Sequence, residues 1–137
     1  MPTYMLGSGI LIRCLRNRSG YLDLLQKLSQ DNDLFISAFT RVEVLRGMRE
    51  REHERTLSLS NALFTHPLDQ ATADRSAELM RVWQARGITL SGPDAVIAAS
   101  ALQVGATLIT TNPRHFPMPE LSVLAADEQG HLTLVSH

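Results

Sequence analysis

The chain has 137 residues, of which 44% are hydrophobic and 20% charged, so we expect a single domain, residues 1–137, built around one core. A formal net charge of −1 excludes the strong overall basic field that attracts nucleic acid. One cysteine, Cys14, excludes an internal disulfide. No run reaches the ~20 apolar residues of a membrane helix, and Met1 to Met5 lack the charged start of a signal peptide, so a cytoplasmic protein is expected.

Short apolar runs alternate with segments of helical periodicity along the chain. The expected strands are residues 4–6, 34–37, 64–68, 107–110, 121–124 and an edge strand at 132–135. The expected helices are residues 10–15, 20–30, 40–51, 57–63, 71–86 and 94–102. This alternation predicts an α/β fold, a three-layer α/β/α sandwich around a short-stranded parallel sheet. Right-handed crossovers would bring the carboxyl ends of the strands to one edge.

Two acids and a polar turn fall where that edge is expected. Asp94 starts an apolar helix, and Glu43 follows the strand that ends near Ser37. The turn from Thr111 to Phe116 follows the expected strand at residues 107–110. Open α/β sheets bind their ligands at this edge. Carboxylates are the ligands that Mg²⁺ and Mn²⁺ prefer, and such ions orient water and offset charge at a scissile phosphate. The pattern indicates metal-dependent phosphoryl transfer.

Each of these residues also has a purely structural interpretation. Thr40 and Glu43 have the spacing of a capping box, so Glu43 could satisfy a backbone N–H at a helix start. Asp94 follows Pro93 and could simply favour the helix dipole. Asn112 could be a turn residue, and His115 could be packed in a loop.

Four segments, in order and spanning nearly the whole chain, resemble the PIN-domain ribonucleases, specifically VapC-type toxins of bacterial toxin–antitoxin pairs. The segments are Tyr4-Met5-Leu6-x-Ser8-x-Ile10-Leu11-Ile12, Ile36-Ser37-x-x-Thr40-x-x-Glu43-Val44-Leu45-x-Gly47, Asp94-x-x-Ile97-Ala98-Ala99-x-Ala101-x-x-x-Gly105 and Thr110-x-Asn112-x-x-His115-Phe116. The resemblance implies a PIN-like fold and an acidic site that binds Mg²⁺ or Mn²⁺ and hydrolyses RNA, with transfer RNA or another structured RNA as the expected substrate.

The resemblance also assigns expected roles to residues. The family's second and third acids match Glu43 and Asp94, its fourth polar position matches Asn112, and the hydroxyl after its first acid matches Ser8. Substrate contacts are expected from Ser8 and from the basic side chains Arg41, Arg46, Arg114 and His115. Expected partners are a cognate antitoxin, operator DNA only through that antitoxin, and a second copy of the chain in a homodimer.

The position of the family's first acid, a metal ligand, is occupied here by Gly7. Glycine has no side chain, so metal binding should weaken greatly and the chain is expected to be poorly active or inactive. Two explanations compete: an engineered or selected loss of an aspartate in an active toxin, or a natural protein that has lost catalysis.

Two other functions compete with the ribonuclease. A naturally non-catalytic module would bind an antitoxin without cutting RNA, and a groove could be formed by Leu22, Leu25, Leu57, Leu59 and Leu63, although ordinary core packing also explains them. A metal-dependent DNase or flap-type nuclease shares the acid pattern but usually needs additional helices to hold duplex ends. The DNase therefore ranks last.

Overall fold

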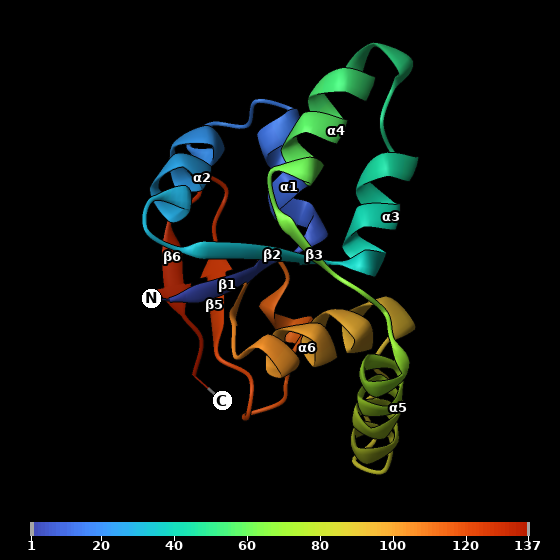
Figure 1. The fold of residues 1–137 in the computed structure, drawn as a ribbon. Coiled ribbons are helices and arrows are strands. Elements are labelled where there is room, and N and C mark those ends of the chain that lie inside the picture. Colours follow the sequence, from blue (N-terminus) through green and yellow to red (C-terminus); the bar gives the residue numbers. More distant parts are fainter. Residues whose placement is uncertain (1, 137) are drawn as a thin grey trace.

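The computed structural model describes residues 2–136 and contains helices on both faces of one sheet (Figure 1). The strands are β1 (Thr3–Leu6), β2 (Asp33–Ser37), β3 (Phe64–His66), β4 (Thr107–Thr110), β5 (Val123–Ala126) and β6 (Leu132–Leu134). The α-helices are α1 (Ser8–Leu15), α2 (Tyr21–Ser29), α3 (Ala38–Arg46), α4 (His53–Asn61), α5 (Gln70–Gln84) and α6 (Gly92–Val104). Short 3₁₀ turns span Glu50–Glu52 and Pro113–His115.

The sheet has six strands in the order β3-β2-β1-β4-β5-β6, which confirms the expected α/β/α sandwich. The first five strands are parallel to one another, and β6 pairs antiparallel with β5. In Figure 1, α1 to α4 lie on one side of the sheet and α5 and α6 lie on the other. No helix among residues 2–136 has the length and apolar character needed to cross a membrane.

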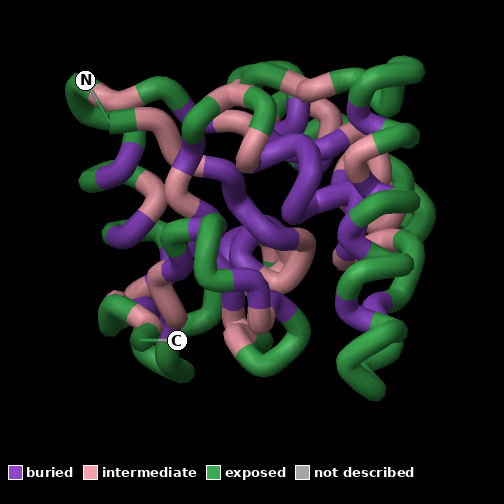
Figure 2. The backbone as a smooth tube through the Cα atoms, turned by 90° about the horizontal axis from the view of Figure 1, so that it is seen from below, coloured by how far each residue is buried: buried purple, intermediate pink, exposed green. Residues whose placement is uncertain are grey.

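The sheet separates two apolar cores. Neighbouring residues of a strand point to opposite faces, so Met5 packs with α5 and α6 while Leu6 packs with α1, α2 and α3. Leu108 and Ile109 divide between the same two cores. Figure 2 shows the buried backbone running through the middle of the molecule. Cys14 is a core residue as expected, at 3% exposure, and burial raises the pKa of its thiol to about 11.

Several element boundaries differ from the sequence expectations. The helix expected at 40–51 starts at Ala38 and ends at Arg46, and α4 begins separately at His53. The expected strand 121–124 lies two residues later, at Val123–Ala126, because Leu121 is buried in the loop before it. Helix α5 ends at Gln84, and Gly87, the expected stop signal, follows with φ +82°.

Two glycines hold the start of α2 against the turn between β5 and β6. Gly20 has φ +85°, and a Cβ atom there would lie 1.8 Å from the carbonyl oxygen of Gln129. Gly130 has φ +77°, and a Cβ atom there would lie 3.0 Å from the carbonyl oxygen of Gly20. Beside them, the Tyr21 hydroxyl donates to the carbonyl of Asp127 at 2.6 Å. Because the two backbones touch here, neither position has room for a side chain.

We therefore expect Gly20→Ala to destabilise the fold more than Gly87→Ala. Both glycines have positive φ, which costs alanine about 1–2 kcal/mol, but nothing lies within 4 Å of a Cβ at Gly87. The clash at Gly20 should add about 1–3 kcal/mol, as overpacking does. Denaturant unfolding of the two variants measures this difference, and equal losses of stability would show that the two backbones are not in contact.

Candidate functional site

A cleft lies at the carboxyl ends of β1, β2 and β4. The sheet order reverses at β1, because β2 lies on one side of it and β4 on the other, and such a switch point leaves a crevice where ligands bind. The cleft has a volume of about 310 Å³. Its lining residues are Gly7, Ser8, Gly9, Glu43, Ser91, Pro93, Asp94, Ile97, Thr110, Thr111, Asn112, His115 and Phe116. It therefore unites the two acids with the polar turn, as the sequence predicted.

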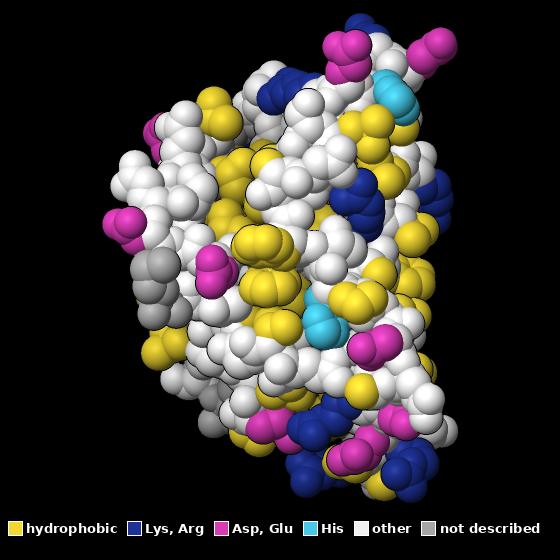
Figure 3. All heavy atoms as spheres, in the orientation of Figure 1, with side chains coloured by type: hydrophobic (Ala, Val, Ile, Leu, Met, Phe, Trp, Pro, Cys, Tyr) yellow, Lys and Arg dark blue, Asp and Glu magenta, His cyan; other side chains and the backbone are white. Residues whose placement is uncertain are grey.

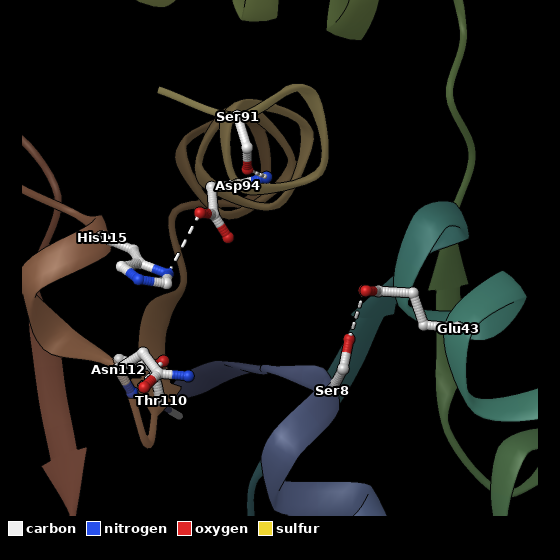
Figure 4. A network of polar contacts seen from close by, with 7 residues as sticks. All are labelled: Ser8, Glu43, Ser91, Asp94, Thr110, Asn112 and His115. Atoms are coloured by element: carbon white, nitrogen blue, oxygen red, sulfur yellow. Dashed lines mark hydrogen bonds and ion pairs between the residues drawn. The ribbon is translucent and has the colours of Figure 1, made fainter. Parts of the chain in front are cut away.

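Glu43 enters the cleft from the second turn of α3. Its carboxylate accepts a hydrogen bond from the Ser8 hydroxyl at 2.7 Å (Figure 4). The capping-box interpretation is wrong, because the helix is capped three residues earlier: Ser37 Oγ accepts from the backbone N–H of Thr40 at 3.0 Å. Glu43 is thus left free of backbone capping and available to the cleft.

Asp94 enters from the first turn of α6, opposite Glu43. The helix is capped by Ser91, whose Oγ accepts from the Asp94 backbone N–H at 3.2 Å, so the Asp94 carboxylate is not needed as the cap. It forms an ion pair of 3.2 Å with His115 Nδ1 when that histidine is protonated. His115 has a 56% exposed side chain and is not a packed loop residue. In Figure 4 the two carboxylates point into the same space.

The polar turn after β4 forms the third wall. Asn112 is held by a hydrogen bond from its backbone N–H to Thr110 Oγ1 at 3.0 Å, and its exposed side chain borders the cleft. Thr111, part of the predicted polar turn, also lines the cleft, and so does Thr110, which was not singled out from the sequence. The signal was present, since Thr110 is the last residue of strand β4 and leads directly into the turn. Gly9 leaves room for Thr111, whose hydroxyl would lie 2.5 Å from a Cβ at that position.

Gly7 is buried and lies in the cleft lining, between β1 and α1. Its φ and ψ of −73° and 160° are ordinary for any L-residue, and it occupies the N-cap position of α1 without a side-chain cap. A Cβ there would lie 3.3 Å from the carbonyl oxygen of Ile109, so a side chain fits only if this carbonyl yields by a few tenths of an ångström. The backbone torsions themselves do not require glycine at this position.

The predicted phosphate-binding arginines do not line the cleft. Arg41 turns toward α4 and β3, where it donates to Asn61 Oδ1 at 2.7 Å and to Thr65 Oγ1 at 3.4 Å. Arg46 and Arg114 are exposed outside the cleft lining. Only Ser8 and His115 of the predicted substrate-contacting set border the cleft itself.

The donors in the cleft fit a hard divalent cation, but in reduced number. Within residues 2–136, no group of three or more His, Cys, Asp or Glu side chains is placed to hold a metal ion. Glu43 and Asp94 supply carboxylates, and Asn112 and Ser8 supply neutral oxygens. Mg²⁺ commonly binds through one or two carboxylates plus waters and substrate phosphates. The cleft could therefore hold such an ion only weakly.

Sequence comparison places this chain among known proteins. The PIN domain family model matches residues 4–119. The chain is 30% identical over 116 residues to Ribonuclease VapC10 of Mycobacterium tuberculosis, covering 85% of this chain and 87% of that protein. It is 31% identical over 99 residues to Ribonuclease VapC19 of the same organism, covering 72% of this chain and 79% of that protein.

Solved structures share the fold. The structure of VapBC2 from Rickettsia felis bound to a promoter DNA fragment superposes with a TM-score of 0.77 at 23% identity, covering 91% of this chain and 99% of the other. A toxin–antitoxin complex from Klebsiella pneumoniae superposes with a TM-score of 0.72 at 27% identity, covering 86% and 94%. The chain therefore belongs to the PIN-domain family, among its VapC-type members.

Proposed function

We propose that this protein is a toxin-type endoribonuclease fold whose cleft hydrolyses RNA with the help of Mg²⁺ or Mn²⁺, and that Gly7 leaves it poorly active. The observation that carries the proposal is the convergence of Glu43 and Asp94, from two different helices, on the switch-point cleft beside Asn112. Its named relatives are ribonucleases. Structured RNA such as transfer RNA is the proposed substrate.

Each residue of the cleft has a proposed task. Glu43 and Asp94 would hold the divalent ion, which supplies charge stabilisation at the scissile phosphate and an activated water. Ser8 fixes the direction of the Glu43 carboxylate through its hydrogen bond of 2.7 Å. His115 would hold the Asp94 carboxylate in place through its contact of 3.2 Å, and Asn112 would orient the phosphate or a water.

Gly7 lines the same cleft as the two acids and brings no charge to it. Two like-charged carboxylates still attract a cation, but a third would strengthen that attraction. Since the backbone torsions at this position suit an aspartate, we expect its absence to affect ion binding rather than folding. This favours the interpretation that an active toxin has lost an acid at position 7. The alternative is a natural module that only binds an antitoxin, and Gly7 is the observation behind that interpretation too.

Partner binding is proposed at an apolar groove between α2 and α4. Leu25, Leu59 and Leu63 line it together with Leu34 and Phe64, and hydrophobic side chains gather there in Figure 3. Leu22 and Leu57, which were also predicted for a groove, lie outside its lining. A cognate antitoxin would cover the groove and carry any contact with operator DNA. The proposed site of action is the cytoplasm, and the homodimer stays a prediction.

Replacing Gly7 by aspartate should create metal-dependent RNA cleavage. We expect Gly7→Asp to cut total transfer RNA in the presence of Mg²⁺ or Mn²⁺ and to stop when EDTA is added, whereas the unmodified chain cuts at least about tenfold more slowly, because a lost charged ligand costs that much or more. Gel analysis of labelled RNA measures the rates.

Gly7→Asn is the matched control for this experiment. Asparagine caps a helix about as well as aspartate and is nearly the same size, but it carries no charge. Cleavage by both variants would show that the side chain acts through helix capping, and cleavage by neither would favour the non-catalytic module. Equal cleavage by the unmodified chain would show that position 7 is not a metal ligand.

Ion binding should also raise the stability of the folded protein, and this effect can be measured independently of catalysis. A ligand that binds only the folded state raises its stability, by about 2.7 kcal/mol at a hundredfold excess over the dissociation constant. We expect Mn²⁺ to raise the melting temperature of Gly7→Asp clearly more than that of Gly7→Asn. The same shift in both variants would place the ion away from position 7.

A further inference from the structure

A pocket rich in arginine lies at the far end of α1, outside the cleft. Its walls are the C-terminal end of α1, the segment before α4 and the first turn of α4, and its volume is about 470 Å³. Four of its seven lining residues are arginines: the lining is Leu15, Arg16, Asn17, Arg49, Arg51, Glu52 and Arg55. In Figure 3, charged side chains gather at this end of the molecule, over the start of α4. The local charge contrasts with the net charge of −1 for the whole chain.

The arginines of this pocket form no ion pair within the part of the protein that the structure describes. Among residues 2–136, the ion pairs within 4.0 Å are those of His115 with Asp94 and of His131 with Asp127, so no arginine has a carboxylate partner. Glu52 is the acid in the lining, and its carboxylate accepts the backbone N–H of Arg49 at 2.8 Å. The pocket therefore offers several unpaired guanidinium groups to an external anion.

Arg55 is held in position before any ligand arrives. Its Nη2 donates to Asn17 Oδ1 at 2.7 Å and to the carbonyl oxygen of Cys14 at 3.3 Å. These contacts tie α4 to the end of α1 and fix one wall of the pocket. A preorganised guanidinium loses less conformational entropy when it binds a phosphate or carboxylate.

One side of α1 leads from the cleft toward the pocket. Ser8, at the start of the helix, faces Glu43, and Ile12, Leu15 and Arg16 follow at helical spacing on the same side. These last three residues border a small hollow that shares Leu15, Arg16 and Glu52 with the arginine pocket. The eight residues of α1 span about 12 Å, a distance that a few nucleotides cover.

The hollow between the two sites also contains an unpaired polar group. Thr56 is 1% exposed, and its hydroxyl has no hydrogen-bond partner among the described residues although it borders the hollow. Buried hydroxyl groups are normally paired. A ligand or water that entered from the pocket side could supply the missing partner.

We propose that the pocket of Arg16, Arg49, Arg51 and Arg55 binds a phosphodiester group of the RNA strand whose neighbouring nucleotides occupy the cleft. This inference rests on the proposed RNA substrate but not on catalysis. An RNA strand is the ligand that must enter the cleft, and the α1 side leads from there to unpaired guanidinium groups. Guanidinium forks match the geometry of phosphate oxygens.

The test measures equilibrium binding of a fluorescein-labelled RNA hairpin to the unmodified Gly7 chain, in EDTA, over a range of salt concentrations. The pocket variant is Arg49→Gln/Arg51→Gln, which leaves Arg55 and its structural contacts in place. We expect it to bind roughly tenfold more weakly near 0.1 M salt, and the slope of log affinity against log salt to fall by about 0.7–0.9 for each lost contact.

Two further variants separate pocket binding from net charge and from misfolding. Lys27→Gln/Arg81→Gln removes the same charge from exposed positions on α2 and α5, and should change affinity by less than about twofold because distant exposed charges are screened. Glu52→Gln keeps an oxygen for the Arg49 N–H but removes the one acid of the pocket, so it should strengthen RNA binding, which a damaged fold would not do.

Equal losses in the pocket variant and the charge-matched control would overturn the proposal, as would no measurable RNA binding by the unmodified chain. If the pocket variant keeps its RNA affinity but loses binding to poly-L-glutamate, the pocket takes an acidic protein segment instead and the proposal also fails. Weaker RNA binding by the pocket variant, together with no cleavage by Gly7→Asp, would uphold the pocket and reject the nuclease assignment.

Discussion

The site depends on two negatively charged side chains, Glu43 and Asp94, that share one cleft. Glu43 and Asp94 belong to helices on opposite faces of the sheet, and they meet because β2 and β4 flank β1, so that the chain crosses over between them. Carboxylates in a shared cleft repel each other unless a positive group stands nearby. The Ser8 hydroxyl and the His115 ring each stabilise one of them. A divalent cation would neutralise both carboxylates at once, and the cleft is therefore suited to binding such an ion.

The same topology explains why position 7 matters. Gly7 follows the central strand β1, and its N–H donates to the carbonyl of Ile109 on β4 at 2.9 Å, so its location is set by the sheet itself. A side chain at the N-cap of α1 would extend from rigid backbone, not from a mobile loop. An acid at this point would therefore add its charge to the cleft from a fixed position.

Much of this arrangement was predictable from the sequence, because strand–helix alternation determines which ends of the strands share an edge. The convergence of Glu43, Asp94 and Asn112 follows from that rule, whereas position 7 was added to the site by the family resemblance. The capping of α3 was not predictable, since Ser37 and Thr40 are both acceptable caps and the choice depends on where β2 ends in the sheet. The direction of Arg41, toward Asn61, depends on the packing of α4, which no local pattern encodes. The arginine pocket likewise brings together residues from segments far apart in the sequence.

Glu43 and Asp94 together are proposed to form a site for a divalent cation. A Mn²⁺ titration followed by electron paramagnetic resonance tests this site, on the Gly7→Asp protein with and without Glu43→Gln. We expect saturable Mn²⁺ binding that Glu43→Gln weakens at least about tenfold, as for loss of a charged ligand. Unchanged Mn²⁺ binding after the loss of Glu43 would contradict this proposal.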